Sequence, residues 1–223
     1  MKTVWFWALG LPCLLLAGQG SFDFNAVKPQ LIATYGQAAG QRLEAWQALL
    51  SEGKARSDLD KLTAVNDFFN QLVFTDDSLL WGKRDYWATP LEFIGVNGGD
   101  CEDFSIAKYF SLLELGIPQD KMRLTYVKAL RLNQYHMVLA YYPRDDAYPL
   151  ILDNLDTDIK SADRRSDLDP IYSFNGKRLW LSKEKGRGAL VGESDRLKLW
   201  SELNRRYRIQ NFNRPLISLE TSP

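Results

Sequence analysis

The chain has 223 residues, 45% of them apolar and 25% charged, which is ordinary for a folded globular protein of one domain or two small lobes that share a core. The 28 lysines and arginines balance the 28 aspartates and glutamates, so the net charge at pH 7 is zero. Without a net positive field, nucleic acid and anionic membrane surfaces are poor default partners.

The first twenty residues have the features of a secretory signal peptide. Lys2 gives a positive start, an apolar stretch covers 4–17, and small residues follow over 17–20. The apolar stretch is shorter than the about 20 residues that a membrane span needs. We expect export, with cleavage just before Ser21 or a few residues earlier. An uncleaved anchor and a lipoprotein attached through Cys13 are the alternatives.

Two amphipathic runs predict helices in the N-terminal half. Apolar residues recur near helical spacing in a first run that stops before Gly53 and in a second run, where Ser57 fits the N-cap and Asp60 follows three residues later. The stripes consist of Leu31, Tyr35, Leu43, Trp46, Leu49 and Leu50, then Leu59, Leu62, Val65, Phe69, Leu72 and Val73. We expect them to form part of the core.

The segment 79–100 is aromatic and rich in glycine, and Pro90 breaks any helical pattern within it. We expect a structured loop there. The next helix is predicted to begin at about Asp100 and to end at Gly116, a residue type that suits the position after a helix.

Strand patterns replace helical ones from residue 123. The segments 123–130, 135–143, 148–155 and 176–182 are rich in β-branched and aromatic residues, with turn residues between them. Helical spacing returns over 194–209. Helices followed by an antiparallel sheet and a last helix predict an α+β fold with two lobes.

Cys101 is the only cysteine outside the leader, so no internal disulfide is possible once the leader is removed. A lone thiol is an oxidation liability in an exported protein, which indicates a use beyond packing. It falls in the first turn of its predicted helix. Unpaired N–H groups and the helix dipole favour a thiolate there, and the same N–H groups could bind an oxyanion.

A base and its orienter are also available. The single histidine, His136, begins one predicted strand and Asp153 lies in the next. Neighbouring antiparallel strands can place an imidazole beside a carboxylate, so that Asp153 orients His136 and His136 activates Cys101. Each residue alone could be an ordinary packed or solvated side chain. Their combination predicts a nucleophilic site.

Three carboxylates flank the thiol, at Asp100, Glu102 and Asp103. They repel one another and raise the thiol pKa, against the helix dipole. Asp100 and Asp103 can be a solvated capping pair that stabilises the helix by about 1 kcal/mol. Alternatively, a bound Ca²⁺ would neutralise the cluster through the oxygen ligands that it prefers. The residues alone leave both possibilities open.

Four motifs resemble the bacterial transglutaminase-like cysteine proteinases: WATPLEF at 87–93, GGDCEDFSIAKY at 98–109, YHMVL at 135–139 and LDNL at 152–155. The resemblance covers most of the chain after the leader, and GDCEDF is its most specific part. It implies a papain-like, transglutaminase-like fold.

The same resemblance implies roles for individual residues. Cys101 would be the nucleophile, His136 the general base and Asp153 its orienter. Calcium dependence is implied as well, with the acidic neighbours of the cysteine as metal ligands: Asp100, Glu102 and Asp103.

We therefore expect a signal peptide over 1–20 and one transglutaminase-like cysteine proteinase domain over 21–223. The helical N-terminal lobe would cover about 21–116 and the antiparallel β-sheet lobe about 117–223.

The resemblance further implies a periplasmic, calcium-dependent cysteine endopeptidase. Similar proteins cut a large repeat adhesin near its N-terminus, at a double-alanine site, which releases the adhesin and promotes biofilm dispersal. An inner-membrane cyclic-di-GMP receptor of the LapD type restrains them. Trp87 and neighbouring aromatic residues are candidates for contact with that receptor.

Other activities use the same triad. Acyl transfer to an amine, as in true transglutaminases, and amide hydrolysis in cell-wall peptide are alternatives, because an amine or water can resolve a thioester. A calcium-responsive binding module without catalysis is the alternative from another class. The intact triad argues against that module, and the lack of a recognisable wall-binding repeat argues against wall hydrolysis.

Overall fold

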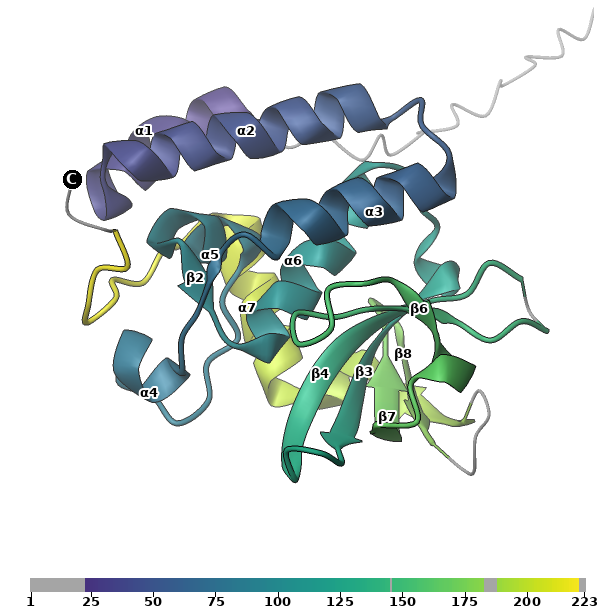
Figure 1. Cartoon of the computed structure of the whole chain (residues 1–223). Helices are drawn as coiled ribbons and strands as arrows, with labels where there is room; N and C mark the ends of the chain where they lie inside the picture. The colour runs from purple at the N-terminus through teal and green to yellow at the C-terminus, as the bar shows by residue number, and fades with distance from the viewer. Residues whose placement is uncertain (1–22, 145, 183–187, 221–223) are drawn as a thin grey trace, which may run out of the picture.

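The computed structural model describes residues 23–144, 146–182 and 188–220. The predicted signal peptide over 1–20, its cleavage site and Cys13 lie outside the described residues. Within them, helices occupy most of the first half of the chain and a seven-stranded antiparallel sheet the second, before a last helix (Figure 1). This arrangement confirms the predicted α+β fold class.

Three amphipathic helices lie on one side of the molecule, across the upper part of Figure 1. They are α1 (Phe24–Tyr35), α2 (Gln37–Gly53) and α3 (Asp58–Phe69). The first predicted run is divided because Gly36 adopts φ 94°, in the left-handed region that glycine tolerates. Ser57 caps α3 as predicted, since its Oγ accepts a hydrogen bond from the Asp60 N–H at 3.3 Å.

The segment predicted as a loop over 79–100 contains a helix, so that prediction is wrong in part. Its elements and the strand before it are β1 (Val73–Phe74), α4 (Asp77–Leu80), α5 (Pro90–Val96) and β2 (Gly98–Gly99), with β1 and β2 paired in parallel. Pro90 takes the first helical position of α5, where its missing N–H is not needed. Thr89 Oγ1 caps the helix by accepting from the Glu92 N–H at 3.2 Å.

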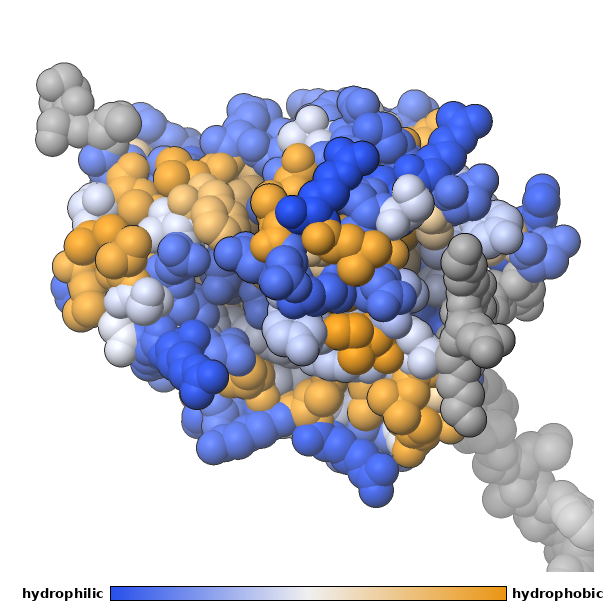
Figure 2. All heavy atoms as spheres, turned by 60° about the horizontal axis from the view of Figure 1, so that its bottom comes forward, coloured by the Kyte–Doolittle hydropathy of each residue, from blue (hydrophilic) through white to orange (hydrophobic). Residues whose placement is uncertain are grey.

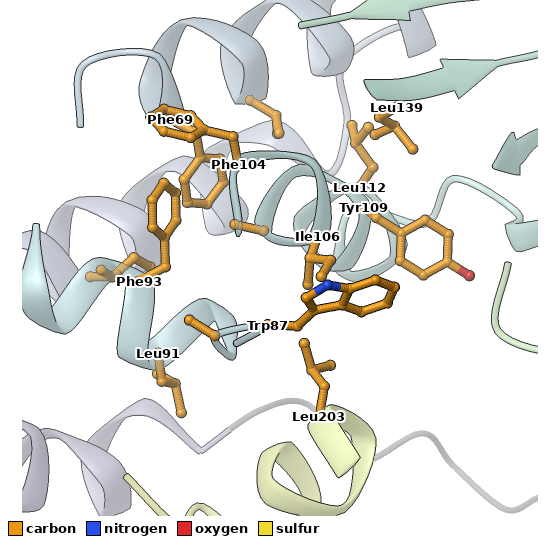
Figure 3. Packing of buried hydrophobic residues seen from close by; sticks show 14 of the residues in the cluster. Phe69, Trp87, Leu91, Phe93, Phe104, Ile106, Tyr109, Leu112, Leu139 and Leu203 are labelled. Carbon is orange, nitrogen blue, oxygen red and sulfur yellow. The ribbon is translucent and has the colours of Figure 1, made fainter. Parts of the chain in front are cut away.

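Helix α6 (Cys101–Glu114) is the centre of the molecule and agrees with the predicted bounds. It contacts α3 and α5 on one side and the strands β3 and β4 on the other. Its apolar residues therefore join both layers into one core, as Figure 3 shows for Phe104, Ile106 and Leu112. Gly116, with φ 85°, ends the helical region.

The sheet has the spatial order β6-β5-β4-β3-β7-β8-β9, and every neighbouring pair is antiparallel. The strands are β3 (Met122–Ala129), β4 (Gln134–Tyr141), β5 (Leu150–Leu152), β6 (Lys160–Ser161), β7 (Leu168–Phe174), β8 (Arg178–Leu181) and β9 (Ala189–Glu193). Four of them match the predicted strands. The sequence pattern missed β7 because Pro170 argues against a central strand; the proline is tolerated beside a bulge, where the pairing with β3 shifts register.

The last helix, α7 (Lys198–Ile209), packs back against α6. The Trp200 ring stacks on Phe110 at a centroid distance of 5.8 Å. Beyond it the chain crosses to the first helices, where Tyr35 Oη donates to the Asn213 carbonyl at 2.6 Å. Short 3₁₀ turns complete the fold, namely η1 (Gln119–Lys121), η2 (Ala162–Arg164) and η3 (Ser194–Arg196).

One part of the surface is apolar. Figure 2 shows apolar side chains gathered on its left, over α4 and the C-terminal segment. The exposed large apolar residues of these segments and of β1 are Val73, Phe74, Leu79, Leu216 and Ile217. We call this set the apolar patch. In the described parts of the chain, none of the helices is long and apolar enough to cross a bilayer.

Candidate active site

His136 and Asp153 form a buried pair, as predicted. His136 lies in β4, and Asp153 directly follows β5, the strand that pairs with β4 further along. His136 Nε2 and Asp153 Oδ1 are 2.7 Å apart. The antiparallel neighbourhood of the two strands therefore brings together the imidazole and the carboxylate.

Asp153 is held by a third residue that the sequence did not single out, Arg165. Its Nη2 donates to Asp153 Oδ2 at 2.7 Å, and the Leu155 N–H donates to Oδ1 at 3.0 Å. Burial alone would raise the pKa of Asp153, but the hydrogen bonds and charges of His136, Leu155 and Arg165 lower it to about 2. No sequence signal distinguishes Arg165 from Arg164, because only the fold decides which of them points inward.

Cys101 is the first residue of α6 and is partly buried. Its Sγ lies 2.8 Å from Glu102 Oε2, in the geometry of a thiol that donates to a carboxylate. Burial, Glu102 and Asp100 together raise the thiol pKa, while a hydrogen bond from the Met137 amide acts in the opposite direction. That amide follows His136 in β4, so the sulfur lies beside the strand that carries the base.

A group of three carboxylates lies next to the cysteine. Oxygens of Asp77, Asp100 and Asp103 are all within 4.8 Å of one another. Asp103 is anchored by the Ala88 N–H, which donates to Oδ1 at 2.7 Å, and by the Asp100 N–H, which donates to Oδ2 at 3.3 Å. Burial and the nearby negative charge of Glu102 raise the pKa of all three acids. We call these residues the acidic group.

The acidic group differs from the set implied by the sequence. Asp100 and Asp103 belong to it, whereas the Glu102 carboxylate lies on the thiol instead. The third member is Asp77, from a short helix 23 positions (100 − 77) before Asp100, and no spacing rule would have found it. Among the described residues, Asp77 Oδ1 and Asp100 Oδ1 are buried oxygens without a hydrogen-bond partner. Such oxygens, in a group of carboxylates, fit a hard divalent cation.

A row of aromatic rings crosses the sheet near the thiol. It runs through Trp87, Phe174, Tyr172, Tyr126 and Tyr135, with successive centroids 5.6, 6.3, 5.1 and 5.5 Å apart. Trp87 is only 5% exposed and Tyr135 is 62% exposed, so the row passes from the core to the surface. The Trp87 ring is therefore packed in the core, and the residues that would contact a receptor stay a prediction.

The assembled residues can support covalent catalysis. The components of nucleophilic acyl transfer are present: a thiol at a helix N-terminus, an imidazole on the strand whose next residue contacts that thiol, and a carboxylate bonded to the imidazole. The helix N-terminus also offers N–H donors for an oxyanion. Asp100 of the acidic group directly precedes Cys101, and its negative charge raises the pKa of the thiol.

Comparisons with known proteins agree with this chemistry. The family model of the bacterial transglutaminase-like cysteine proteinases matches residues 40–168. The chain is similar to the solved structure of EGTA-treated LapG from Legionella pneumophila, with 41% identity, a TM-score of 0.74, and coverage of 83% of this chain and 97% of that one. For calcium-bound LapG from the same organism the identity is 40%, the TM-score 0.72, and the coverage 83% and 99%. No curated protein matches the chain.

Replacing Arg165 tests how Asp153 is held. Arg165→Leu should lower the free energy of unfolding by about 3 kcal/mol in urea denaturation, because it leaves a buried carboxylate without its cation. Lys160→Leu is the control: Lys160 pairs with Asp156 and Asp158 at the surface, and its loss should cost less than about 1 kcal/mol. Equal effects of the two variants would contradict the assignment.

The Arg165 effect should also depend on pH. The pKa of Asp153 is lowered to about 2 in the folded chain, from about 3.9 in an unfolded one. Its stabilisation is therefore complete above about pH 4 and lost as the pH falls through 2. The difference in unfolding free energy between the wild type and Arg165→Leu should shrink over that interval, and a constant difference would speak against the pair.

Proposed function

The chain belongs to the bacterial transglutaminase-like cysteine proteinase family, and on that basis we propose that it is a calcium-dependent endopeptidase whose nucleophile is Cys101. The observation that carries the proposal is the buried His136–Asp153 pair, 2.7 Å apart, beside the strand residue that contacts the Cys101 sulfur. The reaction is hydrolysis of a peptide bond through a thioester.

The first half of the reaction forms the thioester. Because His136 Nε2 faces Asp153 Oδ1, that nitrogen carries the proton and Nδ1 is left to accept the proton of Cys101. The thiolate attacks the scissile carbonyl carbon, and N–H groups at the start of α6 stabilise the oxyanion. His136 then protonates the leaving amine, the C–N bond breaks, and the acyl group remains on Cys101.

The second half releases the acyl group. His136 takes a proton from water, the hydroxide oxygen attacks the thioester carbonyl, and the C–S bond breaks with return of the proton to the sulfur. The products are a new carboxyl terminus and a new amino terminus. Asp153 stays ionised throughout, because its hydrogen bonds hold its pKa at about 2.

The calcium dependence rests on the acidic group. A Ca²⁺ ion bound by Asp77, Asp100 and Asp103 would supply positive charge beside the thiol and satisfy the buried oxygens of Asp77 and Asp100. With these carboxylates neutralised, the thiol pKa is no longer raised by Asp100. The solved LapG structures, described as calcium-bound and EGTA-treated, support the proposal.

The substrate and regulation follow from the family resemblance. We propose that the protein works in the periplasm after removal of residues 1–20, and that it cuts the N-terminal region of a large repeat adhesin to release it. A cyclic-di-GMP receptor of the LapD type would inhibit it. With Trp87 buried, the apolar patch is the better candidate for receptor contact, since large exposed apolar areas mark interaction surfaces.

The nucleophile is tested with Cys101→Ala. The variant should lose at least about 10³-fold in kcat on the N-terminal fragment of the organism's largest repeat adhesin with calcium present, because no other group can form the thioester. The readout is one discrete cut on a gel, with the N-terminus of the product sequenced. An unchanged thermal midpoint shows that the variant is folded. Retained cleavage would show that Cys101 is not the nucleophile. A parallel reaction with an amine donor reveals transferase activity instead.

The metal site is tested with Asp77→Asn. Calcium affinity measured by titration calorimetry should fall at least about tenfold, because a charged ligand is lost. Asp76→Asn is the matched control, since Asp76 is adjacent but exposed and should bind calcium as the wild type does. Glu102→Gln shows whether Glu102 joins the ligands when calcium binds. Equal affinities for the wild type and Asp77→Asn would overturn the site.

A further inference from the structure

Three residues of α6 share one face of the helix. Ser105 and Lys108 follow Cys101 by four and seven residues, which at 100° per residue places the three within about 60° of one another. Ser105 and Lys108 are both buried, and Lys108 is only 1% exposed. A polar stripe on a buried helix face is unusual, since charged groups are costly to remove from water.

Each member of this stripe contacts a segment that carries the base or its orienter. The Cys101 sulfur receives the Met137 amide, and Ser105 Oγ donates to the Met137 carbonyl at 2.9 Å. Lys108 Nζ donates to the Asp153 carbonyl at 3.0 Å. The helix of the nucleophile is thus joined to the residue after His136 and to Asp153 itself. We call Ser105 and Lys108 the polar seam.

Asn70, at the C-terminal end of α3, strengthens the contact between Lys108 and Asp153. Asn70 Nδ2 donates to the same Asp153 carbonyl at 3.0 Å, and Asn70 Oδ1 accepts from Lys108 Nζ at 2.7 Å. The side chain of Asp153 is held by His136 and Arg165, and its main chain by Lys108 and Asn70. The main chain of Asp153 is therefore fixed to α6, and its side chain to His136 and Arg165.

We propose that Ser105 and Lys108 are positioning residues. They fix the position of α6 along its axis and its rotation about that axis, so that the Cys101 sulfur meets the His136 imidazole. The inference rests on the proposed function. A helix packed only through apolar side chains can shift by fractions of an ångström, and a shift of about 1 Å at reacting atoms costs up to 10²-fold in rate. Directional hydrogen bonds at two positions along the helix, from Ser105 and Lys108, prevent such a shift.

Stability is a poor explanation for the lysine. Burial lowers the pKa of Lys108 to about 7, while Asp153 and Asp67 act in the opposite direction, so the charged amine is disfavoured where it lies. Apolar residues of similar volume often replace buried charges without loss of stability. A role in alignment explains why this helix face is polar.

The matched control is on the same helix. Ser111 is as buried as Ser105, but its Oγ accepts from Trp46 Nε1 of α2 at 2.8 Å and donates to the Ala107 carbonyl. Its hydroxyl therefore joins α6 to the outer helices and not to the site. Ser111→Ala removes the same group as Ser105→Ala.

The experiment measures the second-order rate of Cys101 alkylation by iodoacetamide in the mature chain with calcium, together with kcat, KM and the thermal midpoint. Ser105→Ala and Lys108→Met should slow alkylation and lower kcat by about tenfold, with KM within twofold of wild type. Ser111→Ala should change the thermal midpoint as Ser105→Ala does and leave both rates unchanged. Seam variants that keep wild-type rates, or a Ser111→Ala variant that loses as much, would overturn the inference.

A double-mutant cycle with His136→Gln separates alignment from general weakening. If Ser105 acts by aligning Cys101 with His136, Ser105→Ala should have no further effect on alkylation once His136 is replaced. Full additivity contradicts the proposal. If His136→Gln alone leaves alkylation unchanged, the proposed Cys–His function fails, independently of the seam.

Discussion

At the start of α6, the thiol of Cys101 shares a partly buried region with the carboxylates of the acidic group and of Glu102. The helix dipole favours a thiolate there, but burial and the nearby negative charges raise the thiol pKa. Two further features of the site bear on the pKa of the thiol. Among the described residues, the buried Asp77 Oδ1 and Asp100 Oδ1 lack hydrogen-bond partners, which suits a cation. Strand β4, which carries His136, contacts the sulfur through the Met137 amide. The same few residues thus contain both the proposed nucleophile and the charges that disfavour its thiolate.

The negative charges of Asp153 and of the acidic group are compensated differently. Asp153 receives its cation from within the chain, through Arg165, and is therefore ionised at any ordinary pH. For Asp77, Asp100 and Asp103 we propose an external cation. The base and its orienter are then always ready, whereas the nucleophile depends on a metal. In this account calcium controls the sulfur and leaves the His136–Asp153 pair unchanged.

Much of the architecture could be predicted, because apolar residues at helical or strand spacing mark the buried face of each element. The bounds of α6 and the pairing of His136 with Asp153 follow from local patterns and strand adjacency. Asp77 and Arg165 could not be predicted, since Asp77 lies in a short helix and Arg165 just after a 3₁₀ turn, and the placement of both depends on the whole fold. Strand β7 was missed because a bulge, invisible in the sequence, accommodates Pro170. The sequence thus predicts the candidate catalytic residues, whereas the residues that contact them depend on the tertiary structure.

The most direct test of the account measures the rate at which iodoacetamide alkylates Cys101 in the mature wild-type chain at pH 7.5, once with saturating calcium and once with EGTA. No substrate is needed, so the result concerns the thiol alone. Alkylation should be at least about tenfold faster with calcium, because a bound cation offsets the negative charge that disfavours the thiolate. Asp77→Asn should abolish most of this difference. Equal rates with calcium and with EGTA in the wild type would show that calcium does not act on the Cys101 thiol.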